Sequence, residues 1–406
     1  MDASVRLVDL TTLSVLRLAL ALVPPPDLAP YVHQLATPLT AFTRLKEGVH
    51  LYTNGINPYS GGPVRHSPIT VLLFSTVLPT GNLARLLWPL VDIIGAWLLT
   101  RICRIRRGTI DASQERLIAL FYLFNPFIFA CTASLSTSTF DNTLYLAAIY
   151  FACRRQASAA MLSLAMLTMS SLTSSLFLPS LAMLLLSSPI SGLAYPQPFK
   201  SSLSQAVPII LRYAIYLSAL VGISTLVVGD LSWVVRTWGA TLAMPDVTPN
   251  PGLWWYFFTE MFDHFRPFFL MTFSAHLVIY VAPICLKFQH DPLFATFLLQ
   301  GIFATFKAYP SLADPGLFIN SIALFPEIFQ YLKHPLITTM LYLYSSSLLV
   351  LFHNLWLVQG TGNANFYYAS TMVFGLANGF AILDCLRAAL RIAFGPLPDG
   401  WDVLQT

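Results

Sequence analysis

Long apolar stretches recur along almost the whole chain and limit its possible folds more than any other feature. About twelve can be marked, at residues 7–24, 83–102, 117–132, 141–153, 157–171, 173–188, 206–228, 267–286, 292–307, 315–331, 335–357 and 368–386. A helix needs about 20 mostly apolar residues to cross a hydrocarbon core that is about 30 Å thick. The sequence therefore predicts an all-α polytopic membrane protein, with residues 1–406 forming a single membrane domain of about twelve transmembrane helices.

Charged residues are too few for a soluble protein of this length. They make up 10% of the 406 residues, whereas soluble domains carry about 25%. Hydrophobic residues make up 56%, which excludes a disordered chain, because disorder requires low hydrophobicity and high charge. The sequence contains no basic stripe interleaved with aromatic residues, so nucleic acid is not a predicted partner. The five cysteines lack CxxC spacing, which predicts no disulfide framework.

Basic residues indicate how the bundle is oriented. We place the N-terminus in the cytosol and change sides at each apolar stretch. Most basic residues then lie on the cytosolic side, including Arg6, Arg101, Arg104, Arg106, Arg107 and Lys200. Cytosolic loops are enriched in lysine and arginine, so this orientation is favoured, and an even number of spans puts both termini in the cytosol. Two large loops, 24–68 and 229–266, then face the lumen.

The first luminal loop contains a short amphipathic helix that is expected to end at Gly48, followed by turns at Asn57-Pro58-Tyr59-Ser60. This arrangement resembles the first luminal loop of the multi-span glycosyltransferases that use dolichol-phosphate sugars. Those enzymes carry acidic residues at the start of the loop, whereas residues 36–40 here contain no carboxylate. The only acidic residues of the loop are Asp27 and Glu47. A catalytic base must lie within hydrogen-bond reach of its proton, so the sequence predicts no catalytic residue here.

The second luminal loop contains an aromatic stretch that predicts an amphipathic helix in the membrane interface. In one continuous helix, Glu260, Asp263 and His264 would share a polar face, while Trp254, Trp255 and other aromatic residues would cover the rest. The alternative is a metal bound by Glu260, Asp263 and His264. One histidine with two carboxylates on a solvated face is more often unliganded, so we expect no metal and no cofactor.

Five charged residues fall inside the apolar stretches: Arg17, Asp92, Arg212, Glu327 and Asp384. A charge facing lipid is costly, so each is expected to face the bundle interior. Pairing between helices is one explanation, and a polar lining for a lipid headgroup is the other. Asp384 is three residues from Arg387, which favours a local pair. For Glu327 the two explanations stay equally open.

The last luminal loop ends with two asparagines and three aromatic residues, Asn363-Ala364-Asn365-Phe366-Tyr367-Tyr368. Asparagine amides can hydrogen-bond sugar or phosphate oxygens, while aromatic rings hold acyl chains or the membrane interface. The simpler alternative is that Asn365 caps the helix that follows.

Four segments together resemble the PIG-U family, a multi-span subunit of the glycosylphosphatidylinositol (GPI) transamidase complex. They are Glu47-Gly48 with Asn57-Pro58-Tyr59-Ser60-Gly61, the run from Gly252 to Phe262, Phe306-Lys307-Ala308-Tyr309-Pro310 with Asp314, and Asn363 to Tyr368. They extend from the first loop to the last apolar stretch. In the last segment, Ala364 stands where the family has serine between the asparagines.

The resemblance implies a glycosyltransferase-C-like bundle that has lost its catalytic carboxylates. It implies a non-catalytic subunit in the endoplasmic reticulum membrane, which binds the GPI glycolipid and scaffolds the other subunits, including a caspase-like catalytic one. Asn363 and Asn365 would contact the headgroup, with Phe366 and Tyr367 beside them. Glu327 and Asp314 are candidates for a polar lining.

Two other functions are weighed against this one. The first is an active dolichol-phosphate-sugar-dependent glycosyltransferase of the endoplasmic reticulum, which the missing acidic residues disfavour. The second is a secondary transporter, which the lack of evident internal repeats disfavours.

Overall fold

The computed structural model of the chain is a bundle of helices, and its described residues contain no strand. They are residues 10–23, 32–187, 192–194, 196, 203–396 and 400–401. Arg6, Asp27, Lys200 and both chain ends lie outside them. The helices of the first half are α1 (Leu10–Leu22), α2 (Val32–Leu35), α3 (Phe42–Thr53), α4 (Pro68–Thr76), α5 (Ala84–Arg107), α6 (Ala112–Leu123), α7 (Pro126–Ala133), α8 (Ser138–Cys153), α9 (Ala157–Ser170) and α10 (Leu178–Leu186).

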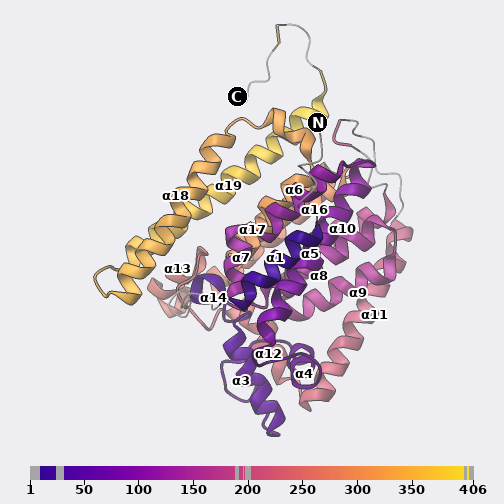
Figure 1. The fold of residues 1–406 in the computed structure, drawn as a ribbon. Helices are drawn as coiled ribbons and strands as arrows, with labels where there is room; N and C mark the ends of the chain where they lie inside the picture. The colour runs from indigo at the N-terminus through magenta and orange to yellow at the C-terminus, as the bar shows by residue number, and fades with distance from the viewer. Residues whose placement is uncertain are drawn as a thin grey trace.

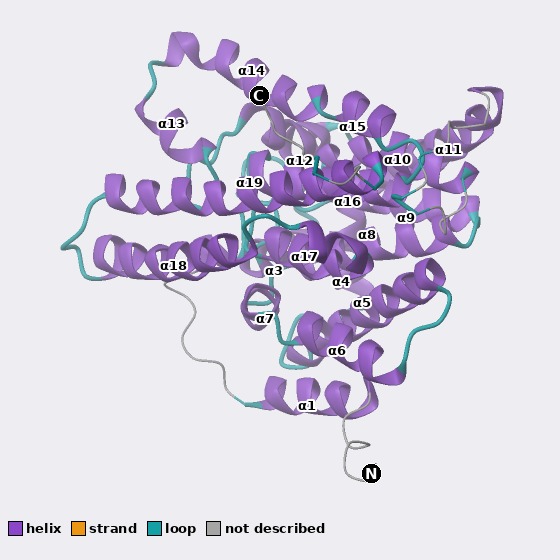
Figure 2. Ribbon diagram, turned by 90° about the horizontal axis from the view of Figure 1, so that it is seen from above, coloured by secondary structure: helices purple, strands orange, loops and turns teal. Residues whose placement is uncertain are grey.

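The second half contains the longest helices and several short turns (Figures 1 and 2). Its α-helices are α11 (Leu203–Val228), α12 (Ser232–Ala243), α13 (Trp254–Glu260), α14 (Arg266–Ile279), α15 (Val281–Lys287), α16 (Pro292–Phe306), α17 (Ala313–Ser321), α18 (Pro335–His353) and α19 (Ala364–Phe394). The 3₁₀ turns are η2 (Leu172–Phe177), η3 (Asp263–Phe265), η4 (Ile322–Leu324) and η5 (Pro326–Tyr331), and η6 (Asn354–Val358) is a π-helical turn that extends α18.

Three helices begin with the same local chemistry, a polar cap followed by proline. Ser67 accepts a hydrogen bond from the Thr70 amide, Asn125 from two amides of α7, and Asp291 from the Phe294 amide. Such caps satisfy amides that have no partner inside the helix. The proline at the next position lacks an N–H that would otherwise be unsatisfied, so the sequence fixes where α4, α7 and α16 start.

Five helices of the described residues are long and apolar enough to cross a membrane: Ala84–Arg107, Ser204–Val228, Asp263–Lys287, Pro335–Val358 and Ala364–Phe394. A sixth arises if α6 and α7, which are bent by 50° at the Asn125 cap, count as one span. Four further apolar helices are shorter, at 10–17 residues. The chain is therefore a helical membrane protein with several spans.

Two boundaries predicted from the sequence are wrong. The helix expected to end at Gly48 continues to Thr53 as α3, since a glycine inside a helix is tolerated at modest cost. The stretch 315–331 is not one span but α17 followed by the turns η4 and η5. Pro326 cannot continue the helix, because it lacks an N–H and its ring clashes with the preceding turn.

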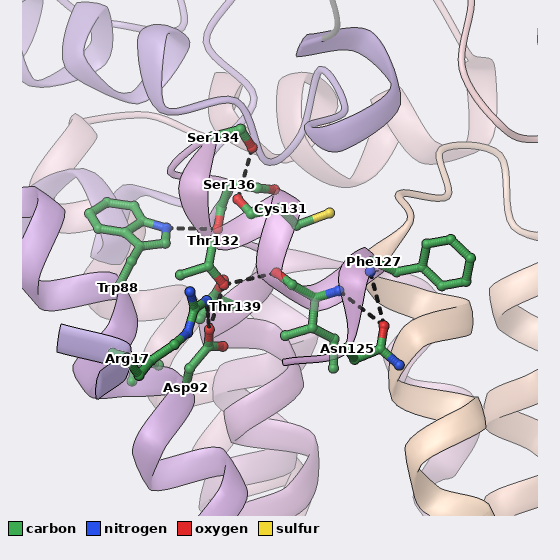
Figure 3. A network of polar contacts seen from close by, with 12 residues as sticks. Arg17, Trp88, Asp92, Asn125, Phe127, Cys131, Thr132, Ser134, Ser136 and Thr139 are labelled. Atoms are coloured by element: carbon green, nitrogen blue, oxygen red, sulfur yellow. Dashed lines mark hydrogen bonds and ion pairs between the residues drawn. The ribbon is translucent and has the colours of Figure 1, made fainter. Parts of the chain in front are cut away.

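A buried ion pair joins α1 to α5 inside the bundle. The Arg17 guanidinium lies 2.8 Å from Oδ2 of Asp92, and both side chains are almost fully buried. Thr132 of α7 donates to the same carboxylate oxygen at 2.6 Å, so three helices meet at this point (Figure 3). Arg17 also lies over the Phe129 ring. These two intraspan charges therefore face the interior, as predicted, and of the two explanations left open the geometry favours pairing between helices.

The other intraspan charges behave differently. Arg212 is exposed on the surface of α11, so the expectation that it faces the bundle interior is wrong. Asp384 accepts hydrogen bonds from the amides of Lys333 and His334, at 2.7 and 3.1 Å, instead of pairing with Arg387. This contact joins the start of α18 to α19, which run side by side as a projecting hairpin in Figures 1 and 2.

The described part of loop 24–68, residues 32–68, packs against loop 229–266. Asp246 of the second loop pairs with Arg44 and Arg65 of the first, at 3.3 and 3.1 Å. Beneath these contacts is a separate apolar cluster, distinct from the main core and made of Phe42, Leu45, Tyr59, Val64, Val71, Phe74, Ala84, Trp88, Met169 and Trp233. The main core lies between the long helices.

Candidate lipid-binding site

The first turn of α19 is held by one of the two asparagines. The Asn363 side-chain oxygen accepts hydrogen bonds from the amides of Asn365 and Phe366, at 2.8 and 3.4 Å. Asn363 is therefore the helix cap, and the alternative that assigned the cap to Asn365 is wrong. Its oxygen is occupied by the cap, which leaves the amide NH₂ directed to the exposed surface.

Asn365 is bound to the second loop through a tyrosine. The Tyr256 hydroxyl of α13 donates to Oδ1 of Asn365. The Tyr256 ring stacks on Tyr368, one turn along α19, with centroids 4.6 Å apart. The Tyr368 hydroxyl in turn donates to the Leu253 carbonyl at 3.1 Å. Two segments more than 100 residues apart are thereby fixed to each other at the start of α19.

An apolar cleft of about 610 Å³ opens beside this tyrosine pair, between α13, α14, α16 and α19. Its walls include Leu253, Phe257, Phe273, Phe306, Tyr368 and Leu376. Gly375 and Gly379 lie one turn apart on α19 and leave its wall flat. A Cβ atom on Gly379 would meet nothing within 4 Å. The volume falls within the range of about 300–1,000 Å³ that is usual for small-molecule sites.

The chemistry of the site is that of a receptor for an amphiphile. The oxygens of Asn363 and Asn365 are both engaged within the protein, so their amide nitrogens remain as exposed donors at the start of α19, before Tyr368 of the cleft wall. We call these two asparagines the rim. Amide N–H groups bind hydroxyl and phosphate oxygens. The cleft next to them is lined almost entirely by apolar and aromatic side chains, which favour acyl chains. A polar rim over an apolar cleft matches a lipid with a sugar or phosphate head.

The two aromatic residues predicted beside the asparagines point in different directions. Phe366 is 57% exposed and stacks on Phe352 of α18. Tyr367 is fully buried and packs between Trp255 and Trp356, at centroid distances of 5.7 and 6.1 Å. Phe366 is therefore accessible at the rim, whereas Tyr367 supports the start of α19 from within the core.

The single amphipathic helix predicted in the second loop does not form. α13 ends at Glu260, Met261 and Phe262 are extended, and Asp263 and His264 lie in the separate turn η3. Pro267 lies in the first turn of the next helix, α14, where its missing N–H is tolerated. Glu260, Asp263 and His264 are exposed, but they do not share a helix face. Within the described part of the chain, no three histidine, cysteine or acidic side chains could hold a metal.

Trp254 and Trp255 are buried in the bundle, each 2% exposed, and do not form the outer face that the sequence suggested. Trp254 packs on Phe273 and donates from its indole to the Phe306 carbonyl at 2.8 Å. The same aromatic pattern fits an interfacial helix and a core helix. Here it places α13 firmly against α14 and α16, where it forms one side of the cleft.

Glu327 belongs to an ion-pair network at the other end of α5. Its carboxylate lies 2.6 Å from Arg106, whose guanidinium also binds Asp291 at 2.7 Å. Arg106 and Asp291 are almost fully buried, and Arg106 also lies over the Phe325 ring. Of the two explanations left open for Glu327, this geometry favours structural pairing.

Asp314 lines a small polar cavity beneath the first loop, together with Thr37, Thr40, Asp141, Lys307 and other residues. It pairs with Lys307 at 2.6 Å and accepts from the Ser311 amide at 2.8 Å. The cavity volume is about 60 Å³. At about 10–15 Å³ per water by this measure, it holds a few waters and no sugar.

Sequence reasoning missed the parts of the site that come from other elements. Tyr256 and Tyr368 were counted only within aromatic runs, and nothing local shows that they stack. A usable signal was the Gly375-x-x-x-Gly379 spacing, which in an apolar helix marks a flat face open to close packing. The cleft itself requires α13, α14, α16 and α19 to be assembled.

Comparison with known proteins shows which family the chain belongs to. The family model described as GPI transamidase subunit PIG-U matches residues 11–374. The GPI transamidase component GAB1 of Saccharomyces cerevisiae is 32% identical over 363 residues, which cover 89% of this chain and 88% of that protein. The GPI-anchor transamidase component PIGU of Homo sapiens is 27% identical and covers 88% of this chain and 87% of its own length. This chain is a member of the PIG-U family, and thus a component of a GPI transamidase that works in a complex with other subunits in GPI-anchor biosynthesis.

Proposed function

We propose that this chain is the non-catalytic subunit that binds the GPI lipid within the transamidase and scaffolds its other subunits. The observation that carries the proposal is the pair of exposed amides, Asn363 and Asn365, at the start of α19, within two turns of Tyr368 in the wall of the 610 Å³ apolar cleft. The rim amides bind oxygens of the glycan or its phosphate, and the cleft takes the acyl chains. Phe366, which stacks on Phe352 of α18, lies beside the lipid headgroup.

The catalytic nucleophile then belongs to another subunit, the caspase-like one that the family resemblance implies. The complex lies in the endoplasmic reticulum membrane, with both termini of this chain in the cytosol. We further propose that the shorter and bent helices complete about twelve spans in a glycosyltransferase-C-like bundle forming one membrane domain. Loops 24–68 and 229–266 then face the lumen, where the GPI headgroup is.

The rival function, sugar transfer from a dolichol-phosphate donor, has one observation in its favour. Asp141 and Asp314 reach a polar cavity under the first loop, although the loop itself offers no carboxylate there. Two facts weigh against it: Asp314 is neutralised by Lys307, and the cavity is far smaller than a ligand site of about 300 Å³.

A substitution in the rim tests lipid binding. Cells that lack the chain are complemented with Asn365→Lys, and the surface level of a GPI-anchored reporter is measured. A cation next to apolar walls costs several kcal/mol, so we expect attachment to fall strongly, and less GPI lipid to co-purify, while the caspase-like subunit still co-purifies. Gln359→Lys, at an exposed position in the same loop, is the control. Normal precursor processing by Asn365→Lys would refute the assignment.

A further inference from the structure

A second cavity of about 270 Å³ lies on another side of the bundle, between α4, α5, α8 and α9. We call it the α4 slot. Most of its wall is apolar, with Leu73, Phe74, Ile94, Leu144, Met166 and Met169 among the residues that form it. It shares no lining residue with the cleft beside α19. Its contents are therefore independent of the proposed GPI site.

The polar end of the α4 slot contains a buried histidine with an unused nitrogen. His66 is 4% exposed, its Nε2 lies 3.3 Å from the Thr137 hydroxyl, and its Nδ1 has no hydrogen-bond partner among the described residues. The Thr137 hydroxyl also lies 3.3 Å from the Thr40 carbonyl. When Nε2 is protonated and donates to this hydroxyl, Nδ1 is a bare acceptor, and in the other tautomer Nδ1 is a bare donor. A lipid hydroxyl can pair with Nδ1 in either tautomer.

Burial and the nearby Arg44 lower the pKa of His66 to about 3, so the ring stays neutral at physiological pH. A second polar group lies one helical turn away. Asp141 follows Thr137 by four residues on α8, and its amide bonds to the Thr137 carbonyl. Both His66 and Asp141 line the slot. Lys307, the cation near Asp141, is paired with Asp314.

The mouth of the α4 slot is apolar and exposed. Leu73 is 38% exposed and Ile94 50%, and Ile94 lies near the middle of α5, one of the long apolar helices. In a membrane protein such side chains face acyl chains and not water. The slot thus opens into the bilayer, with its polar groups at the closed end.

These groups define the chemistry of the occupant. His66 Nδ1 lacks a hydrogen-bond partner, and an unpaired polar atom in an apolar site costs about 1–3 kcal/mol. The Asp141 carboxylate hydrogen-bonds Ser170 and can accept further hydrogen bonds. A carboxylate at the end of the slot repels phosphate and fatty-acid heads. We propose that the α4 slot binds a neutral membrane lipid whose head donates hydrogen bonds through hydroxyl groups, with its apolar body leaving through the mouth between Leu73 and Ile94.

Photocrosslinking in the purified complex tests the proposal. The complex is incubated with photoactivatable sterol, diacylglycerol or phosphatidic acid, and labelled peptides are mapped. We expect the sterol, the diacylglycerol or both to label residues 66–78 or 137–144 at least about fivefold more than phosphatidic acid, and the pattern identifies which neutral lipid is bound. No labelling of these peptides, or equal labelling by phosphatidic acid, would overturn the proposal.

Variants that block the α4 slot, compared with a variant that blocks the cleft beside α19, provide the control. Leu73→Trp and, separately, Ile94→Trp should each reduce labelling of the slot at least about fivefold. Both positions are partly exposed, so the larger ring has room to be accommodated. Leu376→Trp, at the exposed edge of the cleft beside α19, should leave slot labelling unchanged. Unchanged labelling in both slot variants would contradict the assignment, whatever happens to GPI attachment.

Discussion

The hydroxyl of Tyr256 donates to the side-chain oxygen of Asn365, and this bond joins α13 to the first turn of α19. Removing it with Tyr256→Phe leaves the ring stacked on Tyr368 but frees the amide to rotate. A typical hydrogen bond contributes about 0.5–1.5 kcal/mol, so we expect GPI-lipid affinity to fall about two- to tenfold. Lipid co-purifying with the complex is the measurement. Tyr344→Phe, on the exposed side of α18, should have no effect.

Filling the cleft tests whether its empty volume is used. Gly379→Leu places a side chain in the cleft, where a Cβ would meet nothing within 4 Å, so the helix itself is not strained. We expect surface display of a GPI-anchored reporter to fall at least about tenfold, the effect of about 1.4 kcal/mol. Gly222→Leu on α11 is the matched control, since its Cβ position is equally open. Equal display by the two variants would show that the cleft is not the lipid site.

The buried pair of Arg17 and Asp92 should behave as a unit. Arg17→Met leaves an uncompensated carboxylate in the core, and breaking a buried pair in this way costs about 3–5 kcal/mol. The double variant Arg17→Met with Asp92→Asn removes both charges and should regain most of the lost thermal stability. Fluorescence-detected size exclusion after heating measures this. A double variant no more stable than Arg17→Met would contradict the coupling.

The network at Arg106 predicts unequal effects for its two acidic partners. Asp291 is 1% exposed, whereas Glu327 is 33% exposed and screened by its surroundings. Asp291→Asn should therefore lower thermal stability clearly more than Glu327→Gln. GPI attachment should stay normal in Glu327→Gln at permissive temperature. If that variant lost GPI attachment while remaining stable, Glu327 would have a role in the site itself.

His66 makes stability depend on pH in a defined direction. Its pKa is about 3 in the fold, against about 6.5 in the unfolded chain, so below pH 6.5 only the unfolded chain takes up the proton. Stability is complete above pH 6.5 and declines as the pH falls towards 3. The thermal midpoint should drop between pH 7.5 and pH 5.5, and less so in His66→Gln. His50→Gln, at an exposed position in α3, should keep the wild-type slope.

Local sequence was sufficient for the fold class and for part of the interior. The scarcity of charged residues and the length of the apolar stretches predict helices in a membrane. Because a lone charge is costly in lipid, Arg17 and Asp92 were correctly expected inside the bundle. The same reasoning failed for Arg212, which is exposed on α11, because an arginine can lay its apolar stem along the helix and extend its charged head away from the hydrocarbon. The family was correctly inferred from motifs spread along the chain.

The site was only partly predictable because its parts come from separate elements. The pattern around Asn363 and Asn365 indicated polar amides near aromatic rings, but which asparagine caps α19 depends on side-chain geometry. Trp254 and Trp255 fit an interface or a core equally well by composition. Only packing against Phe273 and Tyr367 decides between them. Likewise His66 and Asp141 are 75 residues apart, and no local pattern brings them to one cavity.

The contact between Arg17 and Asp92 has a consequence for how the protein is made. The two residues are 75 positions apart, and ribosomes add about 5–20 residues per second, so α1 emerges about 4–15 seconds before its partner. During that interval the arginine would be alone in the hydrocarbon if α1 moved into the lipid. Arg17 gains its buried partner only once α5 has been synthesised, so the cost of an unpaired charge in lipid favours insertion of α1 and α5 together.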